Sequence, residues 1–588
     1  MLSPRYFIYL AVGRNGETKC GISSNLRVDA AFLAPQGFHE FIVLQPPQPL
    51  WIAEKALKRL LKAPPQDLGK RFRKIASLTV AEIYPQKLLR TVEVSGAELP
   101  WPGEAPPPEV ETLVAGYSLL GGEIPALLQG NGWNPPWDVE DWLQYLVLAG
   151  KIRREAAVTL DALGVPVCRR CGAAGELIRV PCVFCGCDDC YTCTSCQTMG
   201  AARSCTPLYF QAASPQNGRH AAFPDLKPHL EFELTAPQQR AARQLEEFLR
   251  SGGDRFLVWT VCGGGKTEVS FAAVAQVLAE GGQVLFAIPR KDVVQELLPR
   301  FQRAFPGVET AGLYGGSEET HGERFLRVPL TVATTHQCLR FYQRFDLIIL
   351  DEADAFPYQG SAMLRQAVRR ALKPGAKMVI MSATPEKSLL DQALAGRLPY
   401  VSIPARHHRQ PLIVPEMRRE DWARPRPKPG GAHWEPPRII GQFLAEVRAQ
   451  GRKALLFLPT RQLIRDYGPA LVAWADRRGI PGDYVWAASP NRDEAKNALA
   501  AERLCFLVTS TIMERGVTIP GLDVMVLAAD DEAIFDCPTL VQIAGRAGRR
   551  GEPARVIFVA QRISRSMMEC RRWIEGMNQE GKRLGYLD

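Results

Sequence analysis

The sequence predicts an α/β protein with two successive parallel-sheet lobes. From about residue 230 to 400, short apolar stretches alternate with helical stretches, and the same alternation resumes after a Pro/Arg-rich segment. Such alternation is typical of parallel strands joined by covering helices. A dense group of cysteines before the first lobe predicts an additional small module. We therefore expect an N-terminal α+β region (1–165), a cysteine module (166–210), a first lobe (228–405), a linker (406–436) and a second lobe (437–588).

The composition fits a globular protein with a basic surplus. Of 588 residues, 46% are hydrophobic and 23% are charged, and the net charge is +10. This surplus suits a polyanionic partner, although a charge count does not show where the charges cluster. No apolar run approaches the roughly 18 residues of a transmembrane helix. We expect a cytoplasmic protein, in which the 15 cysteines are metal ligands or reduced thiols rather than disulfides.

The N-terminal region shows no chemistry that the sequence reveals. Asn15-Gly16 lies between two apolar stretches and predicts a tight hairpin. Trp133, Trp137 and Trp142 could stack on nucleic-acid bases. We favour a role in the core, because large aromatic side chains are mostly buried.

The cysteine spacing predicts zinc. Two Cys-x2-Cys pairs separated by ten residues are typical of a closed, structural site with four cysteine ligands. The next four cysteines could bind a second Zn²⁺, or the first pair could combine with Cys187 and Cys190. An iron–sulfur cluster is the alternative, but the paired knuckles favour zinc and no ferredoxin-like proline follows the run. The candidate ligands are Cys168, Cys171, Cys182, Cys185, Cys187, Cys190, Cys193 and Cys196, with Cys205 beyond them.

The stretch "FLVWTVCGGGKTE" predicts a phosphate-binding loop between a strand and a helix. The backbone N–H groups of Gly263, Gly264 and Gly265 would surround the phosphates of ATP, aided by the helix N-terminus. Lys266 would reach the β- and γ-phosphates, and the hydroxyl of Thr267 would bind Mg²⁺. The usual first glycine of this pattern is replaced by threonine at position 260.

The stretch "IILDEADAFPY" supplies the acidic half of such a site. Asp351 would hold Mg²⁺ and Glu352 would act as the general base toward the attacking water. Adjacent residues of a strand point to opposite faces, so both carboxylates can serve one site only where the strand ends and the backbone turns. Asp354 is expected to couple the site to neighbouring segments.

The remaining parts of an ATP-driven motor follow in order. Gln238 in "LTAPQQRAA" could bind the adenine edge, and "SATP" follows the acidic box. In the second lobe, "QIAGRAGRR" supplies Gln542, Arg546 and Arg549. Arg549 is the candidate arginine finger, and Arg546 could also contact the γ-phosphate.

A nucleic-acid strand would cross the tops of both lobes, as in superfamily 2 helicases, through backbone contacts that ignore sequence. Threonine hydroxyls suit phosphates, and arginines add long-range attraction. Each of these residues could instead have an ordinary surface or capping role. The candidates are Arg290, Thr334, Thr335, Thr460, Arg461, Thr511 and Arg515.

The strings "DEADAFPY", "TTHQCLRF", "STIMERGVTIP" and "LVQIAGRAGRR", with the cysteine module ending in "CQTMGAARSCTPLY", resemble the late competence helicase family ComFA over about 165–588. The resemblance implies two RecA-like lobes of a superfamily 2 helicase. It also implies an ATP-driven single-stranded DNA translocase at the inner face of the membrane of a naturally competent, Gram-positive-type bacterium. The implied partners are single-stranded DNA, the ComEC channel, a ComFC-like protein and a DprA-like protein.

Three alternatives remain. Primosomal helicases of the PriA type also carry zinc knuckles, but there the cysteines interrupt the second half of the core, whereas here they precede the phosphate-binding loop. A DEAD-box RNA helicase would not be expected to carry the cysteine module. A DNA-binding scaffold with weak ATPase activity is disfavoured by the intact Lys266, Asp351, Glu352 and Arg549.

Overall fold

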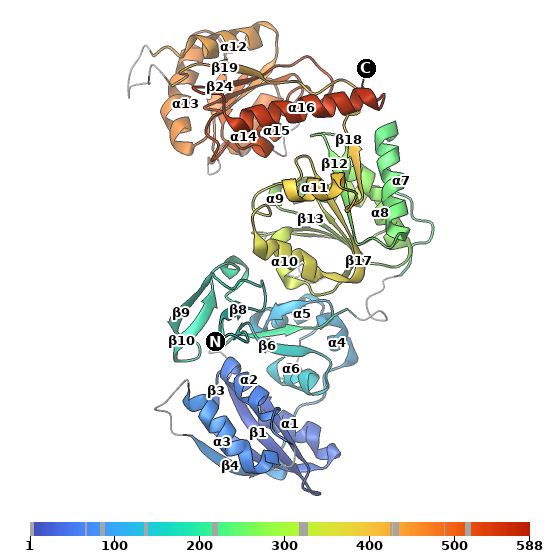
Figure 1. Cartoon of the computed structure of the whole chain (residues 1–588), viewed down its shortest axis with the longest axis vertical. Helices are drawn as coiled ribbons and strands as arrows, with labels where there is room; N and C mark the ends of the chain where they lie inside the picture. Colours follow the sequence, from blue (N-terminus) through green and yellow to red (C-terminus); the bar gives the residue numbers. More distant parts are fainter. Residues whose placement is uncertain are drawn as a thin grey trace.

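The computed structural model shows an elongated chain whose parts follow one another along its long axis in sequence order (Figure 1). Among the described residues, no helix is both long and apolar enough to cross a membrane. The structure describes residues 5–64, 67–82, 89–134, 139–213, 221–316, 327–423, 426, 434–486, 489–511 and 519–587.

The first part is an antiparallel sheet in the order β2-β1-β3-β4 with three helices. β1 and β2 pair around Asn15-Gly16, where Gly16 has a φ of 76°, which confirms the predicted hairpin. The elements are β1 (Tyr6–Gly13), β2 (Thr18–Ser23), α1 (Leu26–Leu33), β3 (Phe38–Gln48), α2 (Leu50–Leu60), α3 (Leu68–Ala81) and β4 (Arg90–Ser95).

A second unit contains the three-stranded sheet β5-β11-β6 and two further hairpins, β7–β8 and β9–β10. Its sheet joins strands from both sides of the expected division at residue 165. Trp142 is buried in its core, Trp133 packs edge-on against it, and Trp137 lies outside the described residues. The elements are α4 (Pro108–Val114), β5 (Ser118–Leu120), α5 (Ile124–Gly130), α6 (Val139–Leu148), β6 (Arg153–Ala156), β7 (Val158–Leu160), β8 (Pro166–Cys168), β9 (Leu177–Cys182), β10 (Cys187–Cys193) and β11 (Pro207–Phe210).

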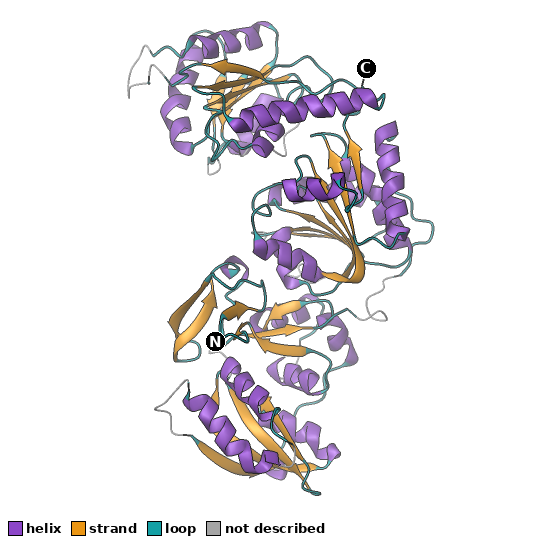
Figure 2. Cartoon of the chain, viewed as in Figure 1, coloured by secondary structure: helices purple, strands orange, loops and turns teal. Residues whose placement is uncertain are grey.

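The first lobe is a seven-stranded parallel sheet in the order β14-β15-β13-β16-β17-β12-β18, with helices on both faces (Figure 2). Its strands are β12 (Arg255–Thr260), β13 (Val284–Ile288), β14 (Thr310–Leu313), β15 (Leu330–Thr334), β16 (Phe345–Leu350), β17 (Leu372–Ser382) and β18 (Tyr400–Ile403). Its helices are α7 (Ala236–Arg250), α8 (Lys266–Ala279), α9 (Lys291–Ala304), the 3-10 helix η7 (Thr335–Arg340), α10 (Ala362–Ala371) and α11 (Lys387–Leu394).

The second lobe is a six-stranded parallel sheet in the order β19-β24-β23-β20-β22-β21. Two tandem parallel-sheet lobes are thus confirmed. The strands are β19 (Glu416–Arg419), β20 (Lys453–Phe457), β21 (Gly482–Tyr484), β22 (Phe506–Thr509), β23 (Leu522–Leu527) and β24 (Val556–Ala560). The helices are α12 (Arg438–Ala449), α13 (Arg461–Asp476), α14 (Arg492–Ala500), α15 (Cys537–Ala544) and α16 (Arg565–Arg583).

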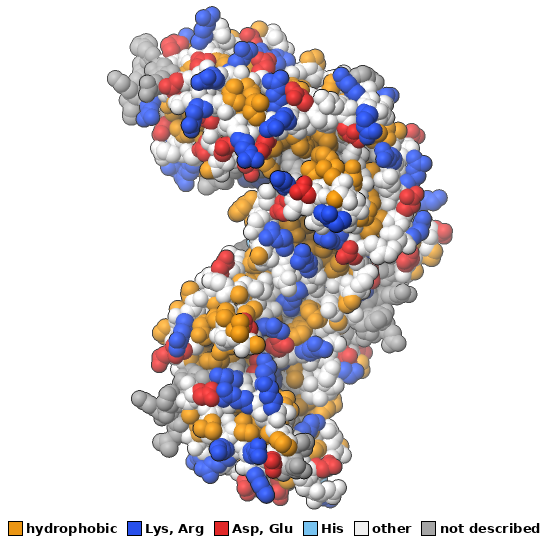
Figure 3. Space-filling view, in the orientation of Figure 1, with side chains coloured by type: hydrophobic (Ala, Val, Ile, Leu, Met, Phe, Trp, Pro, Cys, Tyr) orange, Lys and Arg blue, Asp and Glu red, His pale blue; other side chains and the backbone are white. Residues whose placement is uncertain are grey.

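The cysteine-bearing unit is packed firmly on the first lobe. Tyr117 and Phe341 form an antiparallel bridge, and one hydrophobic cluster contains buried side chains from both units. Arg370 of α10 donates to the carbonyl of Arg169 at 2.7 Å. Because hydrophobic burial and hydrogen bonds both cross this boundary, the unit and the lobe form one packed body. The molecule has a broad concave side between this unit and the second lobe (Figure 3).

Candidate nucleotide, metal and nucleic-acid sites

The phosphate-binding loop has the backbone that its sequence predicts. β12 ends at Thr260, and α8 begins at Lys266. Gly263 and Gly265 have φ values of 80° and 76°, in the left-handed region that favours glycine. A β-carbon at Gly264 would lie 2.3 Å from Oγ1 of Thr260. Thr260, which replaces the usual first glycine of the pattern, therefore packs so closely against residue 264 that only glycine fits there.

The acidic pair lies where the strand ends and the backbone turns. β16 ends at Leu350, and Glu352 has a φ of 52°. The buried carboxylate of Asp351 accepts a hydrogen bond from the Glu352 N–H at 2.7 Å and pairs with Nζ of Lys266 at 2.6 Å. A positive φ outside glycine costs free energy of order 1–3 kcal/mol and is concentrated at functional sites. The turn is what allows two consecutive carboxylates to serve one site.

Burial and charge act in opposite directions on this pair. Burial raises the pKa of Asp351, while Lys266 opposes the rise. Burial alone would lower the pKa of Lys266, but the carboxylates of Asp351, Glu352 and Asp354 outweigh it and raise that pKa. The site therefore keeps Lys266 protonated, as a cation paired with Asp351.

Gln238 holds the phosphate-binding loop to α7. Its Nε2 donates to the Gly264 carbonyl at 3.0 Å, and its Oε1 accepts from the N–H and the hydroxyl of Thr235 at 2.8 and 3.0 Å. Gln238 is buried. Its expected contact with adenine stays a prediction, since its amide here serves the loop itself.

Asp354 joins three segments of the two lobes. Its carboxylate accepts from the hydroxyls of Ser382 and Thr384, both in "SATP", at 2.8 and 3.0 Å. It also accepts from Nε2 of Gln542 in the second lobe at 3.2 Å. Sγ of Cys262 donates to Oε1 of the same glutamine at 3.2 Å. One glutamine thus links the phosphate-binding loop, the acidic box and the second lobe.

The second-lobe arginines face the phosphate-binding loop. A β-carbon on Gly263 would lie 3.7 Å from Nε of Arg549. Burial lowers the pKa of Arg549, and Cys262, Glu296 and Glu352 oppose this. Arg546 is buried close enough to Cys262 for its charge to lower the pKa of that thiol, against the larger upward effect of burial.

Arg406, which the sequence analysis missed, bridges the lobes. Its buried guanidinium donates to the Cys262 carbonyl at 3.0 Å and to the carbonyls of Gly545, Ala547 and Gly548 at 2.8–2.9 Å. Gly545 also allows the second lobe to approach Cys262 closely, because a β-carbon on Gly545 would lie 2.5 Å from Cβ of Cys262. No motif marks Arg406, since its partners are backbone atoms distant in the chain.

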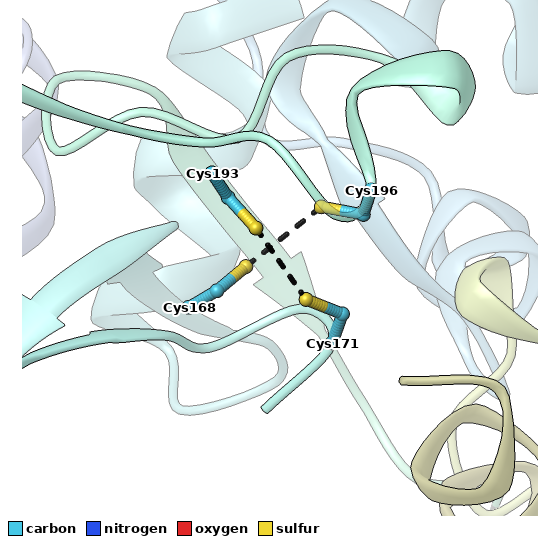
Figure 4. Close-up of side chains that lie close together, drawn as sticks. All are labelled: Cys168, Cys171, Cys193 and Cys196. Atoms are coloured by element: carbon cyan, nitrogen blue, oxygen red, sulfur yellow. Dashed lines mark hydrogen bonds between the residues drawn. The ribbon is translucent and has the colours of Figure 1, made fainter. Parts of the chain in front are cut away.

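The cysteines form two groups whose membership differs from both expected pairings. Cys168 and Cys171 meet Cys193 and Cys196, not Cys182 and Cys185 or Cys187 and Cys190 (Figure 4). The second group contains Cys182, Cys185, Cys190 and Cys205. In each group the four sulfur atoms are buried and lie within 4.8 Å of one another.

Strand geometry explains the regrouping. Cys190 and Cys193 lie three positions apart on a regular stretch of β10, so their side chains point to opposite faces. They therefore cannot form one knuckle, although their spacing suggests it. Cys187 lies before a register shift in the same strand, and its Sγ donates to the Cys185 carbonyl at 3.6 Å. Cys205, which lay beyond the predicted ligands, completes the second group, whereas the predicted ligand Cys187 belongs to neither group.

The candidate nucleic-acid residues lie at the carboxyl ends of parallel strands. Thr334 and Thr335 are buried at the end of β15, whereas Thr460 and Arg461 are exposed after β20. Arg290 follows β13 and pairs with Asp292 at 3.6 Å, and Thr511 follows β22. Arg515 lies outside the described residues. Parallel strands end at the same edge of a sheet, where ligands of such folds are held.

Comparisons with known proteins cover most of the chain. The family described as "Competence protein ComFA N-terminal domain" matches residues 107–210. "Type III restriction enzyme, res subunit" matches 231–387, and "Helicase conserved C-terminal domain" matches 437–551. The match to the ComFA N-terminal domain spans the expected division at residue 165 and includes the entire sheet β5-β11-β6.

The curated relatives agree with these families. Competence protein ComFA of Bacillus subtilis (strain 168) is 35% identical over 442 residues, 75% of this chain and 91% of that protein. Competence protein ComFA of Streptococcus pneumoniae (strain ATCC BAA-255 / R6) is 32% identical over 398 residues, 66% of this chain and 86% of that protein. The solved structure "S. cerevisiae Dbp5 bound to RNA and ADP BeF3" is 16% identical, with a TM-score of 0.42 over 58% of this chain and 91% of that one.

The two RecA-like lobes and the helicase families make the chain a DNA-dependent ATPase of the superfamily 2 helicases. The ordered motifs, the cysteine unit and the similarity to two relatives over most of their length agree with one another. The chain belongs to the competence protein ComFA family.

Proposed function

We propose that the chain is an ATP-driven translocase on single-stranded DNA that draws transforming DNA across the cytoplasmic membrane during natural competence. The observation that carries the proposal is an inter-lobe site in which Lys266 pairs with Asp351 beside Glu352, while Arg549 of the second lobe faces Gly263 of the glycine-rich loop and Arg546 lies near Cys262 of the same loop. This arrangement can respond to the phosphate state of a nucleotide by opening or closing the lobes.

Each residue of the site has a defined task in this proposal. Lys266 holds the β- and γ-phosphates, and Glu352 accepts a proton from the attacking water. Arg549 neutralises charge that develops on the transferred phosphoryl group. Asp351 and Thr267 suit Mg²⁺, which prefers oxygen ligands and when bound supplies charge neutralisation at the phosphate oxygens. The ion pair of Lys266 with Asp351 keeps the two charges adjacent and aligned.

The hydrogen bonds of Asp354 offer a route from hydrolysis to movement. Asp354 contacts "SATP" and Gln542 at once, so a shift of the second lobe changes its partners. A hydrogen-bond network couples two sites only if it has two arrangements with different hydrogen-bond partners. We propose that Gln542 leaves Asp354 when the lobes separate, which changes the hold on the DNA strand.

We propose that each cysteine group binds one Zn²⁺. Zinc at about 2.3 Å from four tetrahedral thiolates places the sulfur atoms about 3.8 Å apart. The measured separations are 3.8 Å for Cys168–Cys196, 3.6 Å for Cys171–Cys193 and 3.8 Å for Cys182–Cys205. The donor set therefore fits a single ion in each group. With four thiolates and no open position, the sites would be structural.

The family suggests the cellular setting of the motor. We propose that it works at the inner face of the cytoplasmic membrane with a ComEC-type channel, and that it hands the strand to ComFC-like and DprA-like proteins. This setting rests on the competence role of the relatives. Loss of DNA uptake in cells that carry Lys266→Ala, with normal protein level, is the expected result.

The ATPase assay tests the motor directly. Single-stranded DNA should stimulate ATP turnover of the full chain, and Lys266→Ala should lower turnover at least 100-fold, about 2.7 kcal/mol of transition-state stabilisation. The exposed Lys387, changed to alanine, is the control and should leave turnover unchanged. Near-parental turnover of Lys266→Ala would remove the assignment of the loop.

Metal analysis tests the ligand sets. The parent should contain two zinc ions per chain, and Cys193→Ser and Cys205→Ser should each lower the content by one. Cys187→Ser is the matched control, because Cys187 packs beside the second group but belongs to neither. Iron in place of zinc, or a loss caused by Cys187→Ser and not by Cys205→Ser, would contradict these sets.

A further inference from the structure

Two exposed arginines lie against one tryptophan in the second lobe. Cζ of Arg461 and Cζ of Arg465 are 5.4 and 5.1 Å from the ring centroid of Trp486. Both arginines come from the first turns of α13, and Trp486 follows β21. The backbone N–H of Trp486 donates to Oγ of Ser489 at 2.8 Å, which anchors the backbone of the residue that carries the ring. The tryptophan thus offers a fixed face on which planar guanidinium groups can stack.

A second arginine–tryptophan pair at the other end of α13 shows what a structural version looks like. Cζ of Arg478 lies 4.4 Å from the ring centroid of Trp474. There, Glu435 pairs with Arg478 at 3.0 Å and accepts from Nε1 of Trp474 at 2.6 Å. Glu435 thus balances the charge of Arg478 and accepts the hydrogen bond of the Trp474 indole, so this pair needs no ligand.

The pair on Trp486 lacks that compensation. Among the residues that the structure describes, neither Arg461 nor Arg465 has a carboxylate partner, and the buried indole N–H of Trp486 has no hydrogen-bond partner. Like charges four residues apart on a helix repel each other. Cations in the first turns of a helix also face the positive end of its dipole, and α13 has no acidic residue in its first turn. An anion is the ligand that would relieve both repulsions.

The position of the pair favours a strand of nucleic acid as the source of that anion. β20, β22 and β21 are adjacent parallel strands. Their carboxyl ends deliver Thr460 and Arg461, Thr511, and Trp486 to one edge of the sheet. Thr460 and Thr511 are already candidates for phosphate contacts, so Trp486 extends the same edge by one strand.

We propose that Trp486 is a positioning residue that holds Arg461 and Arg465 as a phosphate clamp on single-stranded DNA. The proposal rests on the proposed function. Stacking fixes the guanidinium planes, so their N–H edges can meet successive phosphate oxygens with little loss of rotamer freedom. The clamp reads the backbone, which suits a motor that must accept any sequence.

Salt dependence of binding tests the clamp in the full chain. Labelled oligothymidylate is titrated by fluorescence anisotropy at several salt concentrations. Each phosphate contact on a single strand contributes about 0.7 to the slope of log K against log salt. The double variant Arg461→Gln/Arg465→Gln should lower the slope by about 1.4. Trp486→Ala should lower the slope in the same direction, and Trp486→Phe should restore it because phenylalanine keeps an aromatic face.

Two further comparisons make the result decisive. Arg478→Gln removes an arginine from the compensated pair, so it should leave the slope and ATP turnover unchanged. A parental slope in Trp486→Ala overturns the clamp. So does a loss of affinity at unchanged slope that disappears on an abasic oligonucleotide, because the ring would then stack on bases. Absence of DNA-stimulated turnover in the parent would instead refute the motor, and the slopes would still report on the clamp.

Discussion

Arg406 lies at the contact between the two lobes, and Arg154 lies at the contact between the first sheet and the cysteine unit. The two arginines differ in the groups to which they donate hydrogen bonds. Arg406 is buried between the lobes and donates to four backbone carbonyls of the described residues. Arg154 is partly buried between the first sheet and the cysteine unit. Its guanidinium donates to Oε1 of Gln144 at 2.5 Å and to the Ile22 carbonyl at 3.1 Å, and lies 4.6 Å from the Tyr6 ring centroid.

The joint around Arg154 also contains acids. Asp29 is fully buried and accepts from Nε2 of Gln144 at 2.9 and 3.0 Å and from the hydroxyl of Ser23. Glu54 accepts from the Ala156 N–H at 3.0 Å. Burial raises the pKa of both carboxyls to about 7, and the charge of Arg154 opposes the rise.

The difference predicts that the joint between the lobes separates more readily than the joint around Arg154. Carbonyl groups carry no net charge, so Arg406 can exchange carbonyl partners without leaving an opposite charge stranded. We therefore expect a separation of the lobes to leave no carboxylate partner of Arg406 unpaired. At the joint around Arg154, separation would expose two buried acids and the arginine whose charge lowers their pKa values. The stability of that joint therefore depends on the protonation of the two acids.

Arg406→Ala is expected to give the largest effect. Four carbonyls lose the guanidinium donor, of which that of Gly548 still accepts from the Gly551 N–H at 3.3 Å. A buried acceptor without a partner costs about 1–3 kcal/mol. We expect DNA-stimulated ATP turnover to fall at least 100-fold, which corresponds to about 2.7 kcal/mol. Turnover under saturating single-stranded DNA measures this. Arg409→Ala, an exposed neighbour, is the control, and parental activity of Arg406→Ala would show that the two lobes communicate without it.

Arg154→Ala should have a smaller effect, confined to the N-terminal joint. Loss of a hydrogen bond to a charged group costs about 1.5–3 kcal/mol. Hydrogen exchange of α1 and α6 should become faster by about one to two orders of magnitude, since about 1.4 kcal/mol is tenfold. ATP turnover should stay at the parental level. Unchanged exchange in both helices would show that Arg154 does not secure the joint.

The smallest expected effect is the change in stability of the N-terminal joint with pH. The folded-state pKa values of Asp29 and Glu54 lie above their usual values of 3.8 and 4.5. Stabilisation from these groups is complete below about pH 4 and is lost as pH rises through about 7, by at most about 1.4 kcal/mol per pH unit for each group. Protection of α1 should therefore decrease from about pH 5 to about pH 8 after correction for intrinsic exchange.

Asp29→Asn sharpens this measurement. The amide cannot ionise, so the variant should show a flatter pH profile than the parent. Asp67→Asn is the matched control, because Asp67 is an ion-paired surface acid of the same domain. Equal slopes in the parent and Asp29→Asn would mean that Asp29 does not contribute to the pH dependence.

Interior strands were visible in the sequence, and edge strands were not. In the first lobe, the apolar stretches "RFLVWTV", "QVLFAIP", "LTVATT", "FDLIIL" and "AKMVIMSAT" form β12, β13, β15, β16 and β17. In the second lobe, "ALLFLPT", "LCFLVTST", "DVMVLAA" and "ARVIFVAQ" form β20, β22, β23 and β24. The four strands missed, β14, β18, β19 and β21, are the edges of the two sheets. β19, with the sequence "EMRR", even falls within the expected linker. Interior parallel strands are buried on both faces and read as apolar runs, whereas an edge strand is defined by its pairing.

The sites show the same division. The order and spacing of Lys266, Asp351 and Glu352 were enough to expect their meeting, because each is attached to the end of an interior strand or the start of its helix. The pairing of cysteines was not predictable, because it depends on which face of β10 each side chain takes and where its register shifts. Arg406 and Arg154 left no pattern at all.

The sequence by itself determined two apolar-stranded lobes, a glycine-rich loop with its acids and arginines, and a unit rich in cysteines. Only the tertiary structure decided which cysteines meet, how Arg406 and Gln542 join the lobes, and where Trp486 stacks with two arginines. The physical reason is range. Burial of strands and the backbone needs of a glycine-rich loop act within short segments, whereas hydrogen bonds, ion pairs and ring stacking join residues whose proximity arises only when the chain has folded.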